Sequence, residues 1–232
     1  MSHPNEPAFV RAREKIRAIF FDLDGTLMDT DDAFLDSVAG RLERFSGLFP
    51  EGDPRPLLRR AMLAAEGPVN RMVSVLDMVG LDDNLFSIGD RLRRIRGLRV
   101  QGRFVPVEGA VEMIHSLCGS YRLGIVTTRS RNDALAFVRQ FDLEGSFNVV
   151  ATREDTQRLK PHPEPILHAT ALVGLSPSEC AMVGDTAVDI ISAKAAGSYA
   201  VGVLCGFGER EDLSAAGADL ILDHTSHLKA WF

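Results

Sequence analysis

Hydrophobic and polar positions follow two different periods along the chain, and these periods predict its secondary structure. Residues 16–21 (IRAIFF) are apolar except for one arginine, and Gly25 follows soon afterwards, which predicts a short strand buried on both faces. From Val105 onward, extended and helical patterns alternate. Helices are predicted at 111–118, 131–141, 165–173 and 187–196, and strands at 121–127, 147–151, 180–183 and 199–204, before a short final pair at Leu213 and 220–222. Alternation of this kind is typical of βαβ units and a mainly parallel α/β sheet.

A long helical stretch separates the first predicted strand from the others. Residues 30–48 place Phe34, Val38, Leu42 and Phe45 at helical spacing, and similar patterns follow at 55–65, 69–79 and 82–96. We therefore expect an inserted all-α cap domain over residues 29–102. The core is expected at 16–28 and 103–232, after a flexible arm at 1–15. A helical domain on two linkers beside a site could act as a lid.

Two carboxylates follow the first predicted strand directly. Asp22 and Asp24 are separated by Leu23, and since side chains alternate along a strand, both acids should leave on one side. They would then converge on one ligand, provided that a cation or a shared proton compensates their repulsion. The alternative is a surface turn that ends the strand, because Asp and Gly are ordinary turn residues.

Polar side chains also follow the other predicted strands. Thr127 and Thr128 end one strand, Lys160 precedes a helix, and Asp185 and Asp189 follow a third apolar run. In a parallel sheet these ends share one edge, where ligands collect. Hard oxygen ligands suit Mg²⁺, and a lysine can pair with a phosphate oxygen. Taken singly, each residue also has an ordinary explanation: a helix cap, a solvated lysine or a solvent-facing helical acid.

Composition limits the partners. A formal charge of −6 argues against nucleic acid or an anionic membrane as the main partner, and no apolar run is long enough for a membrane span. Cys118, Cys180 and Cys205 lie in apolar runs, so we expect reduced core residues in a cytoplasmic protein. Both a monomer and a homodimer remain open.

The order of these motifs resembles the haloacid dehalogenase superfamily, in its Mg²⁺-dependent phosphatase branch with a helical cap. The residues that carry the resemblance are Asp22-Leu23-Asp24-Gly25-Thr26, Thr127, Lys160, Gly184-Asp185 and Asp189. The resemblance implies a three-layer Rossmann-like parallel sheet as the core of the fold. It also implies an enzyme that hydrolyses a small phosphate monoester, similar to phosphoglycolate phosphatases.

The resemblance implies a role for each matched residue. Asp22 would be the nucleophile that forms an aspartyl-phosphate, and Asp24 the general acid and base. The implied metal ligands are Asp22, Asp24 through its backbone carbonyl, Asp185 and Asp189. The implied phosphate or substrate contacts are Thr127, Thr128, Lys160 and, from the cap, Arg71. Arg71 could equally be a solvated arginine at the start of a helix.

Three other functions are weighed against this one. A β-phosphoglucomutase-like phosphomutase is disfavoured by Phe34, where such relatives carry a histidine. A metal-independent dehalogenase is disfavoured by the presence of Asp24 and Asp185. The alternative that is not an enzyme is a catalytically silent module that binds phosphate. One departure from the family pattern is Thr128-Arg129 in place of an asparagine, which bears on the contact with the leaving group.

Overall fold

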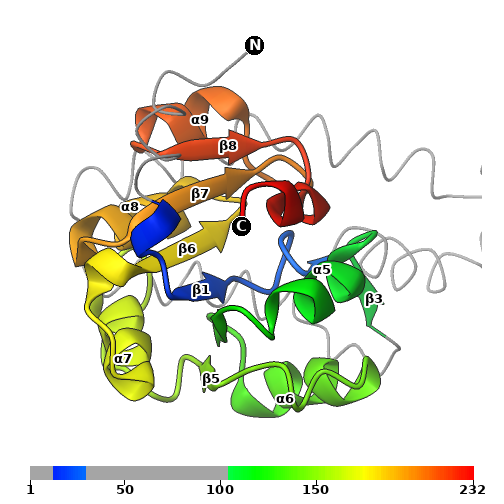
Figure 1. Cartoon of the computed structure of the whole chain (residues 1–232). Coiled ribbons are helices and arrows are strands. Elements are labelled where there is room, and N and C mark those ends of the chain that lie inside the picture. Colours follow the sequence, from blue (N-terminus) through cyan, green and yellow to red (C-terminus); the bar gives the residue numbers. More distant parts are fainter. Residues whose placement is uncertain (1–12, 30–103) are drawn as a thin grey trace, which may run out of the picture. The chain divides into compact units, whose positions relative to one another are not determined.

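The computed structural model describes residues 13–29 and 104–232. The chain divides into two compact units, of which the first comprises Met1–Asp29 with Phe104–Phe232 and the second Thr30–Arg103. All described residues belong to the first unit, drawn in colour in Figure 1. The predicted cap, including Arg71 and Phe34, and most of the predicted arm lie outside the described residues.

A parallel sheet with six strands forms the centre of the described unit. In spatial order its strands are β5 (Val149–Ala151), β4 (Arg122–Val126), β1 (Ala18–Phe21), β6 (Cys180–Gly184), β7 (Tyr199–Val203) and β8 (Leu220–Leu222). Every neighbouring pair in this sheet is parallel. From β1 the chain adds β4 and β5 on one side of the sheet, and then it crosses over to add β6, β7 and β8 on the other side. The topological switch point therefore lies between β1 and β6.

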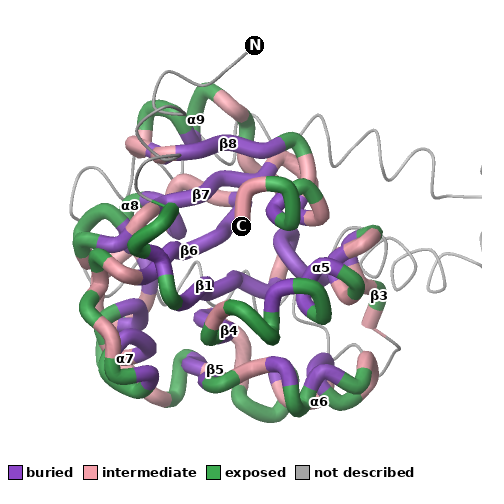
Figure 2. Tube along the Cα trace, viewed as in Figure 1, coloured by how far each residue is buried: buried purple, intermediate pink, exposed green. Residues whose placement is uncertain are grey.

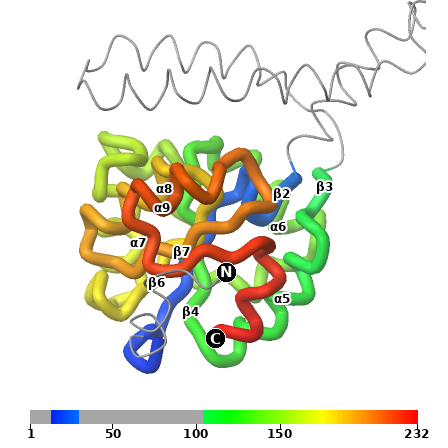
Figure 3. The backbone as a smooth tube through the Cα atoms, turned by 90° about the horizontal axis from the view of Figure 1, so that it is seen from above, coloured from blue at the N-terminus to red at the C-terminus, as the bar shows by residue number. Residues whose placement is uncertain are grey.

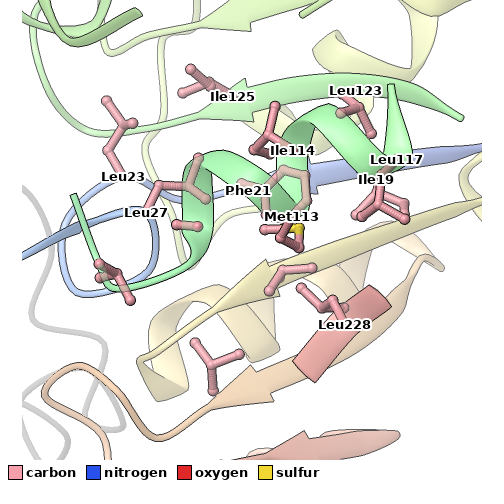
Figure 4. Close-up of a cluster of buried hydrophobic side chains, with 14 of the residues drawn as sticks. Ile19, Phe21, Leu23, Leu27, Met113, Ile114, Leu117, Leu123, Ile125 and Leu228 are labelled. Atoms are coloured by element: carbon pink, nitrogen blue, oxygen red, sulfur yellow. The ribbon is translucent and has the colours of Figure 1, made fainter. Parts of the chain in front are cut away.

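Alternate residues of each strand face two different helical layers. Phe21 and Ile125 point into a cluster with the helices α5 and α6, shown in Figure 4. Phe20 and Met182 point into a second cluster with α7, α8 and α9. The bounds are α5 (Ala110–Leu117), α6 (Arg131–Gln140), α7 (Glu164–Val173), α8 (Ala187–Ala196) and α9 (Arg210–Ala215). The sheet is therefore buried on both faces, as Figure 2 shows, and the predicted three-layer α/β fold is confirmed.

Local signals set the ends of several helices. Ser130 precedes α6 and its hydroxyl accepts a hydrogen bond from the backbone N–H of Asp133. Gly174 and Gly197 follow α7 and α8 with φ of +66° and +79°, the left-handed conformation in which glycine commonly ends a helix. The predicted helix over 187–196 therefore has the bounds of α8.

A two-stranded antiparallel sheet brings together the two ends that flank residues 30–103. Met28 in β2 (Met28–Asp29) pairs with Pro106 in β3 (Val105–Pro106), and Asp29 pairs with Val105. Figure 3 shows these two strands side by side. The sequence did not predict this pairing, because two-residue strands carry no periodicity.

The C-terminal segment packs on the α5 side of the sheet. The 3-10 helices of the unit are η1 (Arg13–Lys15), η4 (Pro177–Glu179) and η5 (Thr225–Ala230), and Leu228 of η5 is fully buried. Cys118 is exposed, so the expectation that all three cysteines are core residues is wrong: Cys118 follows the last turn of α5, where the chain turns back toward solvent. None of the helices within 13–29 and 104–232 is long and apolar enough to span a membrane.

Candidate active site

The carboxyl ends of β1, β4 and β6 place polar side chains around the switch point of the sheet. Asp22 follows β1, Thr127 follows β4 and Asp185 follows β6. The backbone N–H of Asp22 still bonds the carbonyl of Val183 at 2.9 Å, so the residue is held in register as it leaves the sheet. The loop between β5 and α7 adds Lys160, and the first turn of α8 adds Asp189.

Lys160 lies at the centre of this group and is buried. Its ammonium donates to Asp22 Oδ1 at 2.8 Å, to Asp189 Oδ1 at 2.6 Å and to the carbonyl of Val126 at 3.0 Å. These three bonds use all three donors of the ammonium. Burial alone would lower the pKa of Lys160, but the carboxylates of Asp189 and Asp22 more than offset this effect and leave the pKa raised. The side chain is therefore a fixed positive charge.

Asp22 is buried beside this ammonium. The pKa of Asp22 is raised to about 7, chiefly by burial; the charge of Lys160 opposes this rise, and the charges of Asp189 and Asp24 add to it. An ionised Asp22 therefore needs more positive charge than Lys160 alone provides.

Asp185 is fully buried and enclosed by backbone. Its Oδ1 accepts from Thr26 Oγ1 at 3.2 Å and its Oδ2 from the backbone N–H of Phe207 at 2.8 Å. A Cβ at Gly25 or at Gly206 would lie 2.2 Å from Asp185 Oδ2, so both positions require glycine for space. Burial, followed by the charges of Asp189 and Asp22, raises the pKa of Asp185. Sequence reasoning missed the contribution of Gly206 and Phe207, because a backbone N–H leaves no motif.

Asp189 is buried and anchored through both of its oxygens. Its Oδ1 accepts from Lys160, and its Oδ2 accepts from the backbone N–H and the hydroxyl of Thr186 at 3.2 and 2.7 Å. The alternative of a solvent-facing helical acid is therefore wrong for Asp189, since the side chain lies under the sheet edge. Its main visible effect is to hold Lys160 in place.

Three carboxylates lie close enough to share a cation. Asp22, Asp185 and Asp189 each offer one oxygen, and these atoms lie within 4.8 Å of one another. With Asp24 they make four acids, and the ion pairs within 13–29 and 104–232 set Lys160 and Arg129 against them, so these described residues alone carry a formal excess of two negative charges. A divalent ion with a preference for carboxylate oxygen, such as Mg²⁺, fits both the donor atoms and the missing charge.

Asp24 and Arg129 form a separate ion pair at the edge of the cluster. Arg129 Nε donates to Asp24 Oδ2 at 2.7 Å and Arg129 Nη2 donates to Asp24 Oδ1 at 2.6 Å, so the ion pair is bidentate. The carboxylate of Asp24 therefore faces the guanidinium. Arg129 stood out in the sequence only as a departure from the family pattern.

Thr127 lies beside this pair. Its buried hydroxyl oxygen accepts from the backbone N–H of Arg129 at 3.1 Å, which leaves the hydroxyl hydrogen able to donate. Thr128 is half-buried on the same loop. The structure thus gathers seven of the eight residues singled out from the sequence at one sheet edge, and the eighth, Arg71, lies outside the described residues.

The fold and the carboxylate cluster define an α/β enzyme with an acidic, lysine-centred site at the switch point of its sheet. Residues 19–203 match the haloacid dehalogenase-like hydrolase family, and the chain belongs to this family. The resemblance stated from the motifs and the prediction of a hydrolase of this type are both confirmed.

Curated relatives include pyrophosphatases. Pyrophosphatase PpaX from Anoxybacillus flavithermus is 31% identical over 214 residues, which cover 92% of this chain and 95% of that protein. The PpaX of Bacillus pumilus is 30% identical over 216 residues, with coverage of 93% and 95%.

Solved structures share the fold. A haloacid dehalogenase-like family hydrolase from Streptococcus pneumoniae matches with a TM-score of 0.65 at 23% identity, covering 94% of this chain and 99% of that one. A predicted phosphoglycolate phosphatase from Haemophilus somnus matches with a TM-score of 0.62 at 20% identity, covering 92% and 96%. At these identities the comparison establishes the architecture.

Proposed function

We propose that this protein is a Mg²⁺-dependent phosphatase that hydrolyses a small phosphorylated molecule through an aspartyl-phosphate on Asp22. The observation that carries the proposal is that Asp22, Asp185 and Asp189 each place one oxygen within 4.8 Å of the others, while the buried Lys160 pairs with Asp22 and Asp189. Asp22 is buried among other carboxylates, so it can attack an anionic phosphate only where cations neutralise the negative charge of both.

The proposed hydrolysis has two steps, formation of the aspartyl-phosphate and its hydrolysis. A carboxylate oxygen of Asp22 bonds to phosphorus while the bond from phosphorus to the leaving oxygen breaks, and Asp24 gives that oxygen a proton. Water then bonds to phosphorus, Asp24 takes its proton, and the bond to Asp22 breaks to release inorganic phosphate. Thr127 donates to a phosphoryl oxygen where charge develops, and Lys160, whose three donors hold Asp22, Asp189 and Val126, stabilises the phosphoryl oxygens through its positive charge.

Asp22 and Asp185 are the residues that would hold the magnesium ion, with support from Asp189 and the backbone carbonyl of Asp24. When bound, the ion would supply the two missing positive charges and polarise a phosphoryl oxygen.

Two substrates are candidates, one from the motif resemblance and one from the curated relatives. Phosphoglycolate follows from the subgroup that the motifs resemble, and pyrophosphate is favoured by the curated relatives at 30–31% identity. Both are small anions, for which the same two steps apply. We propose a phosphorylated metabolite of this size as the partner, in the cytoplasm, rather than nucleic acid or membrane.

A phosphate-release assay tests this function. The purified protein is expected to hydrolyse p-nitrophenyl phosphate with Mg²⁺, to lose activity in EDTA and to regain it when Mg²⁺ is restored. A silent phosphate-binding module would release no phosphate from this substrate, pyrophosphate or 2-phosphoglycolate under any of these conditions. A phosphomutase would instead convert β-glucose 1-phosphate to glucose 6-phosphate faster than it releases phosphate.

A further inference from the structure

Among the described residues, two cations contact the acids of the site, and Arg129 differs from Lys160 in having N–H groups that can still bind a ligand. Lys160 is buried and spends its three donors on Asp22, Asp189 and Val126. Arg129 gives two N–H groups to Asp24, out of the five that a guanidinium carries. Its side chain is 24% exposed and that of Asp24 is 28% exposed, so this pair reaches the surface of the site.

The backbone fixes where this guanidinium lies. The N–H of Arg129 donates to Thr127 Oγ1 at 3.1 Å, and its carbonyl accepts from the N–H of Arg153 at 3.4 Å. Ser130, the next residue, caps α6. Arg129 is therefore held between Thr127 and Asp24. With the roles proposed above for these two residues, its guanidinium would lie beside the leaving group.

We propose that Arg129 is a specificity-determining residue whose guanidinium binds an anionic oxygen on the leaving group. The inference rests on the proposed function and extends it to a substrate class: molecules with a second oxyanion next to the bond that breaks. A phosphate or a carboxylate can share the guanidinium with Asp24, because both match its planar donors. The leaving group of pyrophosphate is itself a phosphate, and the leaving group of 2-phosphoglycolate carries a carboxylate.

The competing explanation is that Arg129 only holds Asp24. In that case its removal should lower hydrolysis equally for two substrates whose leaving oxygens are similarly basic, since such substrates depend on Asp24 to the same degree. A contact with the leaving group instead lowers hydrolysis selectively. The difference between substrates, and not the size of the loss, therefore separates the two explanations.

The kinetic experiment compares R129Q and R129K with R131Q at saturating Mg²⁺. Arg131 is a matched control, because it lies two residues away, is 44% exposed and pairs with Asp155. Each anionic substrate is compared with a reference whose leaving oxygen is similarly basic: pyrophosphate with p-nitrophenyl phosphate, and 2-phosphoglycolate with 2-hydroxyethyl phosphate. For R129Q we expect kcat/KM to fall roughly tenfold to a hundredfold more on the anionic member of a pair than on its reference, the loss typical of a charged hydrogen bond. R129K should fall in between, and R131Q should match the wild type on all four substrates. The larger of the two selective losses identifies a phosphate or a carboxylate as the preferred group.

A binding experiment removes the dependence on turnover. With Mg²⁺ present, calorimetry should show that the wild type and R131Q bind methylenediphosphonate more tightly than phenylphosphonate, and that R129Q loses this preference. An equal loss on the two members of each matched pair, or an unchanged preference in R129Q, overturns the inference and leaves the phosphatase proposal standing. A wild type that hydrolyses nothing but keeps an Arg129-dependent preference overturns the phosphatase proposal alone.

Discussion

Lys160 Nζ lies 2.6 Å from Asp189 Oδ1, and both side chains are almost fully removed from solvent. The two residues come from different elements, the loop after β5 and the first turn of α8. Both oxygens of Asp189 accept hydrogen bonds, so Asp189 holds Lys160 in one defined position. From this position the ammonium also donates to Asp22. The ion pair therefore acts as the internal support of the site, and its loss should affect the whole fold.

Replacing Lys160 with methionine should destabilise the protein. The change removes the ammonium and leaves the buried Asp22 and Asp189 without compensation, which typically costs about 3–5 kcal/mol of unfolding free energy. Urea unfolding at neutral pH without added metal measures this loss.

The matched control is Lys194→Met. Lys194 also pairs with an aspartate, Asp219, at 2.7 Å, but it is 42% exposed. An exposed pair of this kind contributes less than about 1 kcal/mol. Equal losses for K160M and K194M would contradict the supporting role of Lys160.

The alternation of strand and helix patterns predicted the core because each element was long enough to show its period. The strands predicted at 121–127 and 199–204 contain β4 and β7, and the helix predicted at 131–141 contains α6. The β2–β3 pair and η5 were missed for the opposite reason. They are short, and their positions depend on contacts with distant segments, such as Leu228 against the core.

The sequence also indicated which side chains would meet at the sheet edge, since parallel strands bring their carboxyl ends together. It could not indicate which partner each side chain takes. Arg129 and Asp24 are 105 positions apart and Asp185 and Phe207 are 22 apart, and nothing local relates either pair. The role of Asp189 in holding Lys160 likewise depends on folding, because an acid four residues after Asp185 is compatible with solvent as well.

Replacing Asp22 with asparagine should abolish turnover and keep the fold. An amide does not form the covalent intermediate, so kcat should fall by about a thousandfold or more, while Lys160 keeps Asp189 and Val126 as acceptors. Phosphate release and thermal unfolding measure the two effects. Asp212→Asn, at an exposed position of α9, should change neither. Near wild-type hydrolysis by D22N would refute the assignment of the nucleophile.

The metal-free protein should lose stability as the pH rises from about 4 to 7. The pKa of Asp22 is raised from 3.8 to about 7 in the folded state, and that of Asp185 is raised as well. In this range Asp22 holds its proton more in the folded protein than in the unfolded chain, so it lowers the unfolding free energy by up to about 1.4 kcal/mol per pH unit, and Asp185 acts in the same direction. Urea unfolding in EDTA at several pH values measures the slope, which should be smaller in D22N.

Magnesium should reverse this trend, because the ion binds ionised carboxylates. The increase in Tm on adding Mg²⁺ is expected to be larger at pH 8 than at pH 5. An increase of the same size at both pH values would mean that Asp22 and Asp185 do not bind the ion.

Replacing Gly206 with alanine should weaken magnesium binding through Asp185. The added Cβ would lie 2.2 Å from Asp185 Oδ2 and 2.6 Å from the carbonyl oxygen of Gly25, so the carboxylate or the loop must move. Displacing a metal ligand through its supporting contacts commonly costs about tenfold to a hundredfold in affinity. The overpacking should also cost about 1–3 kcal/mol of unfolding free energy. Magnesium titrations of activity and calorimetry measure the first effect, and urea unfolding measures the second.

Gly145→Ala is the control, since a Cβ there meets nothing within 4 Å and should change stability by less than about 0.5 kcal/mol. If G206A and G145A bind magnesium equally well, then the contact between Gly206 and Asp185 does not set the position of a metal ligand.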